Sequence, residues 1–239
     1  MYDNPPEESC SAMEIKKRTE VNNYLDPSVE IVFFDIDNTI LETETAPNLV
    51  QWVVAFENYV RSHKRMRELS EQDFFIYIQQ HIVDFIEHMR PALVEDEVLG
   101  VIHAIEQRNI PIIGLTNRPL KSAEITASQL RTFGLDFSSH QFNPQEYNFE
   151  ALERTALFKD GIIIGNSNNK GLLIKEFLEK IRFRPKKLLF IDDSERFVHD
   201  VEHVLRDSMI EVLGLRYGFL DEKMTEFSLS LEMIPEELR

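Results

Sequence analysis

The chain has 239 residues, of which 43% are hydrophobic and 28% charged, and its net charge at pH 7 is −16. This length is enough for one large domain, or for one domain with an insertion. The acidic balance disfavours nucleic acid as a partner, the single cysteine (Cys10) excludes an internal disulfide, and no apolar run is long enough for a transmembrane segment.

The N-terminal residues are acidic and lack the apolar stretch of a Sec-type signal peptide. We expect residues 1–27 to form a peripheral segment, with a polar helix over residues 12–24. The predicted location is the cytoplasm, or the outside of the cell by a route that needs no Sec signal.

The first buried strand is predicted over residues 31–34, Ile-Val-Phe-Phe, because four apolar residues of β-branched and aromatic type follow one another. Asp35 and Asp37 stand at its carboxyl end, the edge where open α/β sheets bind ligands. Two ionised carboxylates there repel each other unless a cation or a proton lies between them, and hard oxygen ligands suit Mg²⁺. The alternative is an ordinary Asx-rich turn.

The next segment, residues 46–91, is predicted to be a helical insertion, and residues 94–108 a helix of the core. Trp52, Tyr59 and Tyr77 are the insertion residues best suited to face a substrate cleft. The basic run from Arg61 to Arg67 is either a solvated loop or a patch for an anionic substrate or a membrane surface.

Three further apolar runs predict strands that also end in polar residues. The runs and their polar residues are 110–115 with Thr116 and Asn117, 161–165 with Lys170, and 187–191 with Asp192 and Asp193. A fifth strand is predicted over residues 210–215, and Asp160-Gly161 predicts a hairpin turn. Strands that alternate with helices favour an α/β fold with a doubly wound, mainly parallel sheet.

The four polar clusters, in this order, resemble the motifs of the haloacid dehalogenase (HAD) superfamily over roughly residues 30–215. The resemblance implies a core of residues 28–45 and 92–239, and a helical type-1 cap over 46–91 that closes over the site. The alternative is that these helices have no gating role. The implied activity is that of a Mg²⁺-dependent phosphomonoesterase with an aspartyl-phosphate intermediate.

The resemblance also implies roles for single residues. Asp35 is the nucleophile, and Asp37 is the acid that protonates the leaving oxygen and later activates water, which favours a phosphatase over a dehalogenase. Thr116, Asn117 and Lys170 bind the phosphoryl group. Mg²⁺ is held by Asp35, the backbone carbonyl of Asp37 and Asp192, while Asp193 is either a further ligand or a residue that orients one.

The substrate stays open between phosphotyrosine in proteins and a sugar or nucleotide phosphate, and a catalytically inactive HAD-like binding protein is the alternative of another class. The residues within these motifs resemble those of a branch of secreted phosphotyrosine phosphatase effectors of intracellular bacteria. The glutamate-containing C-terminal residues 235–239 fit either a secretion signal of such an effector or a frayed acidic tail.

Overall fold

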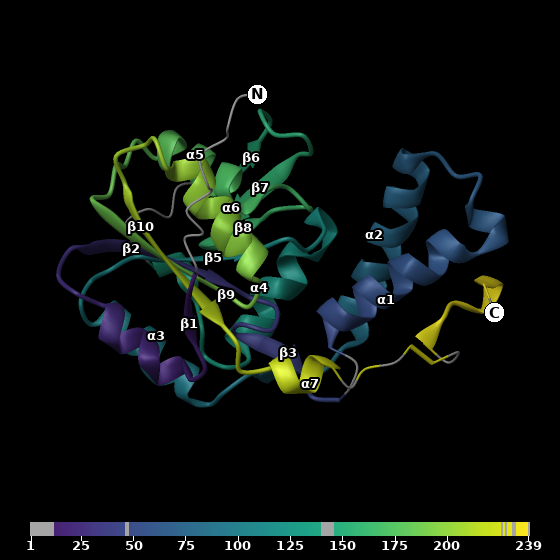
Figure 1. Cartoon of the computed structure of the whole chain (residues 1–239), viewed down its shortest axis with the longest axis horizontal. Helices are drawn as coiled ribbons and strands as arrows, with labels where there is room; N and C mark the ends of the chain where they lie inside the picture. The colour runs from purple at the N-terminus through teal and green to yellow at the C-terminus, as the bar shows by residue number, and fades with distance from the viewer. Residues whose placement is uncertain are drawn as a thin grey trace, which may run out of the picture.

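The computed structural model describes residues 12–45, 48–139, 146–225, 227, 229–230 and 233–238. Among these residues, an eight-stranded sheet has the order β1-β10-β9-β2-β5-β8-β7-β6 (Figure 1). In that order the strands span Met13–Ile15, Glu211–Tyr217, Lys187–Asp192, Val29–Asp35, Ile112–Thr116, Ile162–Ile164, Ala156–Lys159 and Tyr147–Phe149. The first six are parallel, and β7 and β6 are antiparallel to their neighbours. The predicted α/β fold with a mainly parallel sheet is confirmed.

Helices cover both faces of the sheet, because successive residues of a buried strand pack on opposite sides. Phe34 belongs to a hydrophobic cluster with α3 and α4, and Phe33 to a second cluster with α5 and α6. These helices span Glu97–Glu106, Ala123–Arg131, Lys170–Lys180 and Glu195–Leu205. The sheet is therefore doubly wound, and the carboxyl ends of its parallel strands meet at one edge.

The turn between β7 and β8 forms as predicted. Asp160 and Gly161 have φ of 52° and 75°, and the two strands pair antiparallel. A Cβ on Gly161 would lie 2.0 Å from the carbonyl oxygen of Phe137, in the short helix η4 (Phe137–Ser139). Both the positive φ and the close approach therefore require glycine.

The polar helix expected over residues 12–24 is wrong. Residues 13–15 form strand β1, which pairs with β10, and η1 (Arg18–Tyr24) is a 3-10 helix. Ile15 and Val21 are fully buried in the core. The described part of the N-terminal segment is thus not peripheral, and residues 1–11 lie outside the described residues.

Two helices lie beside the sheet rather than on it (Figure 1). α1 (Leu49–Ser62) and α2 (Glu71–His88), called here the helix pair, are joined through η2 (Lys64–Met66) and share a hydrophobic cluster of their own. The chain reaches and leaves them through an antiparallel ribbon of β3 (Leu41–Thr43) and β4 (Pro91–Leu93). The expected helical insertion is therefore present, while its action as a cap stays a proposal.

Two of the three aromatic residues expected to face substrate are engaged elsewhere. Trp52 stacks on Phe56 and Phe85, with 4.7 Å between ring centroids in each case. Its indole N–H donates to the carbonyl of Met233 over 3.3 Å, and the Tyr59 hydroxyl donates to the carbonyl of Leu238 over 2.7 Å. For Trp52 and Tyr59 the prediction was therefore wrong, since their polar ends bind the C-terminal residues.

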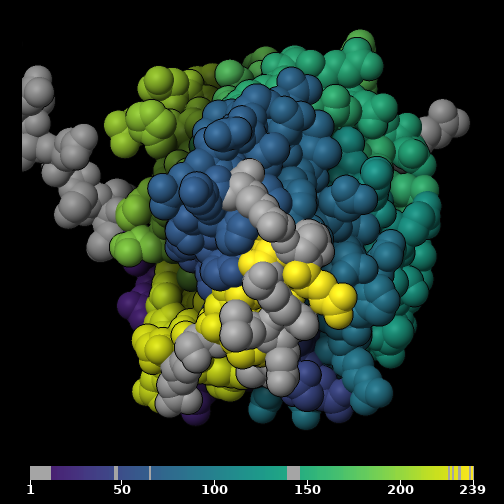
Figure 2. All heavy atoms as spheres, turned by 90° about the vertical axis from the view of Figure 1, so that its right-hand side faces the viewer, coloured from purple at the N-terminus to yellow at the C-terminus, as the bar shows by residue number. Residues whose placement is uncertain are grey.

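The described C-terminal residues are packed, not frayed. After β10 come α7 (Asp221–Thr225) and η6 (Glu236–Leu238). Ile234 and Leu238 are 4% and 1% exposed and belong to the cluster of the helix pair. Figure 2 shows yellow C-terminal residues lying against the blue residues of the helix pair. These residues thus extend the helix pair, although the prediction counted them with the core.

The basic run has partners within the helix pair. Arg61 lies over the ring of Phe74, 3.9 Å from its centroid, and its guanidinium is 3.4 Å from the carboxylate of Glu71. Arg67 donates to the carbonyl of Ser62 over 3.1 Å. Contact of this run with a membrane surface stays a prediction.

Candidate active site

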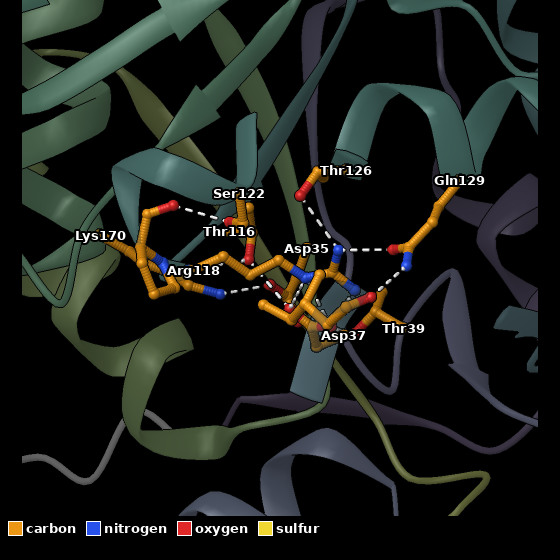
Figure 3. A network of polar contacts seen from close by, with 11 residues as sticks. Asp35, Asp37, Thr39, Thr116, Arg118, Ser122, Thr126, Gln129 and Lys170 are labelled. Atoms are coloured by element: carbon orange, nitrogen blue, oxygen red, sulfur yellow. Dashed lines mark hydrogen bonds and ion pairs between the residues drawn. The ribbon is translucent and has the colours of Figure 1, made fainter. Parts of the chain in front are cut away.

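Four of the predicted site residues meet at the carboxyl edge of the sheet. Asp35, Thr116 and Asp192 are the last residues of β2, β5 and β9, and Lys170 is the first residue of α5. All four are buried. Figure 3 shows Asp35, Thr116 and Lys170 close together. Segments up to 157 residues apart in the chain therefore converge because parallel strands end at the same edge.

The ammonium group of Lys170 lies between two carboxylates. Its Nζ is 2.6 Å from Oδ1 of Asp35 and 2.6 Å from Oδ2 of Asp192. Burial lowers the pKa of Lys170, but the charges of Asp192 and Asp35 outweigh it and hold that pKa above its ordinary value. Lys170 is therefore a fixed positive charge beside Asp35.

Asp35, Asp192 and Asp193 form a group that could hold a metal ion. Each offers one oxygen, and these oxygens all lie within 4.8 Å of one another. When all three carboxylates are ionised they carry −3 and Lys170 carries +1, so a charge of −2 is left, which a divalent cation neutralises. A site of carboxylate oxygens is the donor set that Mg²⁺ prefers.

Neighbouring groups orient these acids. The backbone N–H of Ser194 donates to Oδ1 of Asp192 over 2.8 Å, and the Asn38 amide donates to Oδ2 of Asp193 over 3.0 Å. Asn38 has φ of 59°, a conformation that Asn adopts more readily than most residues. The turn after β2 can therefore curl back toward Asp193.

Burial changes the ionisation of all three acids. It raises the pKa of Asp35, whose neighbours Asp192 and Asp37 add to the effect while Lys170 opposes it. It likewise raises the pKa of Asp192. Burial, together with the charge of Asp35, raises the pKa of Asp193 to about 7. Without a cation, the group therefore retains protons that ordinary carboxyl groups lose, a property that clusters at functional sites.

Asp37 points to a different set of partners. Its Oδ2 accepts a hydrogen bond from the Thr116 hydroxyl over 2.9 Å. The guanidinium of Arg118 binds the same carboxylate, with Nη2 2.8 Å from Oδ1 and Nε 3.1 Å from each oxygen. Thr116 thus binds Asp37, while its expected binding of phosphate stays a prediction. Metal ligation through the Asp37 carbonyl stays a prediction.

Arg18, a residue of η1, supports the loop that follows β2. Thr39 Oγ1 is 3.3 Å from Oδ2 of Asp35, and the carbonyl of Thr39 accepts a hydrogen bond from Arg18. Arg18 is fully buried, and its guanidinium lies over Tyr217, 3.6 Å from the ring centroid. Burial lowers its pKa to about 10. The N-terminal segment therefore supports the loop that carries Asp35 and Asp37.

Asn117 is placed differently from the other predicted residues. Its side-chain Oδ1 is buried and has no hydrogen-bond partner among the described residues, and a Cβ on Gly165 would lie 2.5 Å from it. The carbonyl of Asn117 accepts from the N–H of Ser167 over 3.3 Å. Binding of phosphate by Asn117 stays a prediction.

Arg118 is the main functional residue that sequence reasoning missed. It stands directly after two predicted site residues, in Thr116-Asn117-Arg118-Pro119, yet an arginine in a turn is usually solvated. Its burial, with 1% of the side chain exposed, depends on Asp37, which is 81 positions away in the chain, and on Thr126 and Gln129 of α4. The only signal in the sequence was its position beside a motif.

A model of a known family matches residues 14–235, nearly the whole chain. Its description is "Protein of unknown function (DUF2608)". The chain belongs to this family.

Relatives of this family member occur in intracellular bacteria. A protein of Chlamydia trachomatis serovar D, named "Putative outer membrane protein", is 22% identical over 188 residues, which cover 78% of this chain and 68% of the relative. An "Uncharacterized protein" of Rickettsia bellii is 22% identical over 231 residues, covering 91% and 77%. In the part of the chain that the structure describes, no helix is long and apolar enough to cross a membrane. The expected cellular location stays a prediction.

Two solved structures are similar over most of the chain. A HAD family hydrolase of Deinococcus radiodurans, with bound phosphate and sodium, is 11% identical and covers 84% of this chain and 96% of its own, with a TM-score of 0.41. A HAD family enzyme of Bacteroides thetaiotaomicron, a magnesium complex, is 11% identical and covers 84% and 100%, with a TM-score of 0.43.

Proposed function

We propose that this protein is a Mg²⁺-dependent phosphomonoesterase that works through a phosphorylated Asp35. The observation that carries the proposal is the position of Lys170 between Asp35 and Asp192, next to the third acid Asp193. Phosphoryl transfer needs positioning and charge stabilisation above all. A buried nucleophile that lies beside both a fixed cation and an acidic group supplies both.

The chain's own residues account for each bond that changes. A carboxylate oxygen of Asp35 forms a bond to phosphorus, and the bond from phosphorus to the leaving oxygen breaks. Asp37 gives its proton to that oxygen, which leaves as an alcohol. Asp37 then takes a proton from water as the water oxygen forms a bond to phosphorus and the bond from phosphorus to the Asp35 oxygen breaks. Phosphate and free Asp35 are released, and Asp37 again holds the proton that it donates in the first step. Thr116 and Arg118 hold Asp37 in place.

The three acids of the group are the residues that would hold Mg²⁺. Bound there, the ion would neutralise the negative charge that a phosphate ester brings to a site already rich in carboxylates. Lys170 contributes a positive charge that contacts both Asp35 and Asp192. α5 begins at Lys170, and anions are favoured at the N-terminus of a helix.

The same residues bear on the alternative of an inactive binding protein. Asp35, Asp37, Lys170 and the metal-binding acids are all present and mutually oriented. A protein that only binds partners would not need a nucleophile, a fixed cation and a separately held acid together. We therefore favour the enzyme.

For the substrate, we propose a phosphate carried on an aromatic or peptide group, with phosphotyrosine in a protein as the specific case. A groove of about 660 Å³ runs between α2 and the turn after Arg118, and Phe75, Val83 and Pro119 are among its apolar lining residues. The groove adjoins the site residue Arg118 through Pro119, and a leaving group that reached from Asp35 into it would be larger than that of a small metabolite phosphate. The competing proposal is a sugar or nucleotide phosphate.

The test is hydrolysis of para-nitrophenyl phosphate by the full chain, with Mg²⁺ and with EDTA. We expect turnover that depends on Mg²⁺, that is lost in Asp35→Asn and that persists in Asp207→Asn, a matched change at an exposed position. Absence of Mg²⁺-dependent turnover by the folded wild type, or full activity of Asp35→Asn, contradicts the proposal. A panel of metabolite phosphates beside phosphotyrosine peptides then decides the substrate class by kcat/KM.

A further inference from the structure

Arg118 connects Asp37 to residues beyond the site. Its Nε and Nη2 bind Asp37, and its Nη1 donates to Oγ1 of Thr126 over 3.0 Å and to Oε1 of Gln129 over 2.7 Å (Figure 3). Thr126 and Gln129 are both in α4 and are 0% and 4% exposed. Each terminal nitrogen of the guanidinium, and Nε, thus has a partner, so the planar group is fixed in orientation.

Gln129 in turn contacts the helix pair. Its side-chain Nε2 donates to the carbonyl of Ile86 over 3.0 Å. Ile86 lies in the last turn of α2, where backbone carbonyls have no further N–H group of the helix to bind. A continuous chain of hydrogen bonds therefore runs from Asp37 through Arg118 and Gln129 to the end of α2.

We propose that Arg118 and Gln129 are positioning residues that make the orientation of Asp37 depend on the seating of the helix pair. The inference rests on the proposed function, in which Asp37 is the proton donor. When α2 is seated on α4, the side chain of Gln129 donates a hydrogen bond to the carbonyl of Ile86 and accepts one from Arg118. Arg118 is then held in the position that aligns Asp37. When α2 moves away, the buried amide of Gln129 loses its acceptor, and an unsatisfied buried polar group is costly.

The consequence is a specific kinetic signature. Misalignment of Asp37 weakens protonation of the leaving oxygen, which matters most for a poor leaving group such as an alkoxide. Attack by Asp35 and the charge of Lys170 are not altered, because neither residue contacts Arg118 or Gln129 through a hydrogen bond in the described structure. A purely structural role would instead slow every substrate alike or lower stability.

The test compares Gln129→Met with the wild type on an aryl phosphate and on an alkyl phosphate. We expect kcat for the alkyl ester to fall by about tenfold more than kcat for the aryl ester, with KM for the aryl ester and Mg²⁺ affinity unchanged. Arg118→Lys should give the same pattern more strongly, since a point charge cannot hold Asp37 and Gln129 together. Gln72→Met, at an exposed position of α2, is the matched control and should match the wild type.

Folding is followed separately, through the thermal midpoint and the emission of Trp52, the one tryptophan of the chain, which stacks inside the helix pair. If a folded variant loses activity equally on both esters, or loses none, the inference is wrong. The proposed function still stands in that case, because it depends on the activity of the wild type. An inactive wild type overturns the proposed function itself, and the inference with it.

Discussion

Nζ of Lys170 lies 2.6 Å from Oδ1 of Asp35, and both side chains are almost completely buried. The first belongs to the start of α5 and the second to the end of β2, so the contact exists only in the folded chain. A buried cation and a buried nucleophile that neutralise each other cannot be changed singly without leaving a charge unpaired.

Lys170→Met should therefore reduce turnover of aryl and alkyl phosphates by the same factor, about a hundredfold or more, since the cation stabilises the transferring group of every substrate. The free energy of unfolding of the metal-free protein should fall as well, because the buried carboxylates of Asp35 and Asp192 lose the cation that pairs with them. Steady-state kinetics and denaturant titration measure the two effects. Lys175→Met, an exposed lysine of the same helix, is the control; a Lys170 variant that discriminates between the esters would contradict a general electrostatic role.

Asp37→Asn should preserve Mg²⁺ binding, because the Asp37 side chain lies outside the group formed by Asp35, Asp192 and Asp193. Turnover of alkyl phosphates should fall by about 10²–10⁴-fold, and that of aryl phosphates by less, since a phenolate needs less protonation to leave. Calorimetric titration with Mg²⁺ and the ratio of the two kcat values check this. Equal losses on both esters would argue against Asp37 as the acid.

The stability of the metal-free protein should fall as the pH rises. Asp193 has its pKa raised from 3.8 to about 7 in the folded chain, so the folded state binds the proton more tightly than the unfolded state does. The stabilisation is full at and below about pH 4 and is lost as the pH approaches 7. Asp193→Asn removes the share of this dependence that comes from Asp193, while the raised pKa values of Asp35 and Asp192 keep the rest. The thermal midpoint of this variant should exceed that of the wild type at pH 8 but not at pH 4.

With Mg²⁺ at pH 8, the thermal midpoint of the wild type should instead exceed that of Asp193→Asn. Mg²⁺ binds to the folded state and stabilises the wild type more than the variant, which lacks one of the three acids. Thermal midpoints at both pH values, with Mg²⁺ and with EDTA, measure this. Asp207→Asn should behave as the wild type throughout. If Asp193→Asn kept the full pH dependence, the assignment of that dependence to Asp193 would be wrong.

Two glycines should respond oppositely to alanine. A Cβ on Gly171, next to Lys170, would lie 2.6 Å from the carbonyl of Asp200 in α6, so Gly171→Ala should push α5 from α6, displace Lys170 and cost about 1–3 kcal/mol of stability. Gly100, in the exposed face of α3, has nothing within 4 Å of the added Cβ. Gly100→Ala should instead stabilise by about 0.5–1 kcal/mol through helix propensity. Denaturant titration and phosphatase kinetics on both variants test the contrast.

Much of the fold was predictable because its signals are local. Runs such as residues 31–34 and 188–191 are apolar and are followed by acids, and both lie in strands of the parallel sheet. The Asp160-Gly161 turn needs positive φ at both positions, and these residue types tolerate it. The segment over residues 12–24 was predicted wrongly because a three-residue strand is defined by pairing with β10, about 200 residues away, and leaves no periodic pattern of its own.

The sequence by itself determined the four parallel strands β2, β5, β8 and β9 and the polar residues that follow them. Because parallel strands end at the same edge of a sheet, this also predicted that Asp35, Thr116, Lys170 and Asp192 meet there. Only the tertiary structure decided what holds Asp37. The partners of Arg118 come from α4, and the acceptor for Gln129 comes from the last turn of α2. The contact of Arg118 with Asp37 joins residues 81 positions apart, and that of Gln129 with Ile86 joins residues 43 positions apart. Such contacts depend on how helices pack on one another, and packing is a property of the assembled core rather than of any one segment.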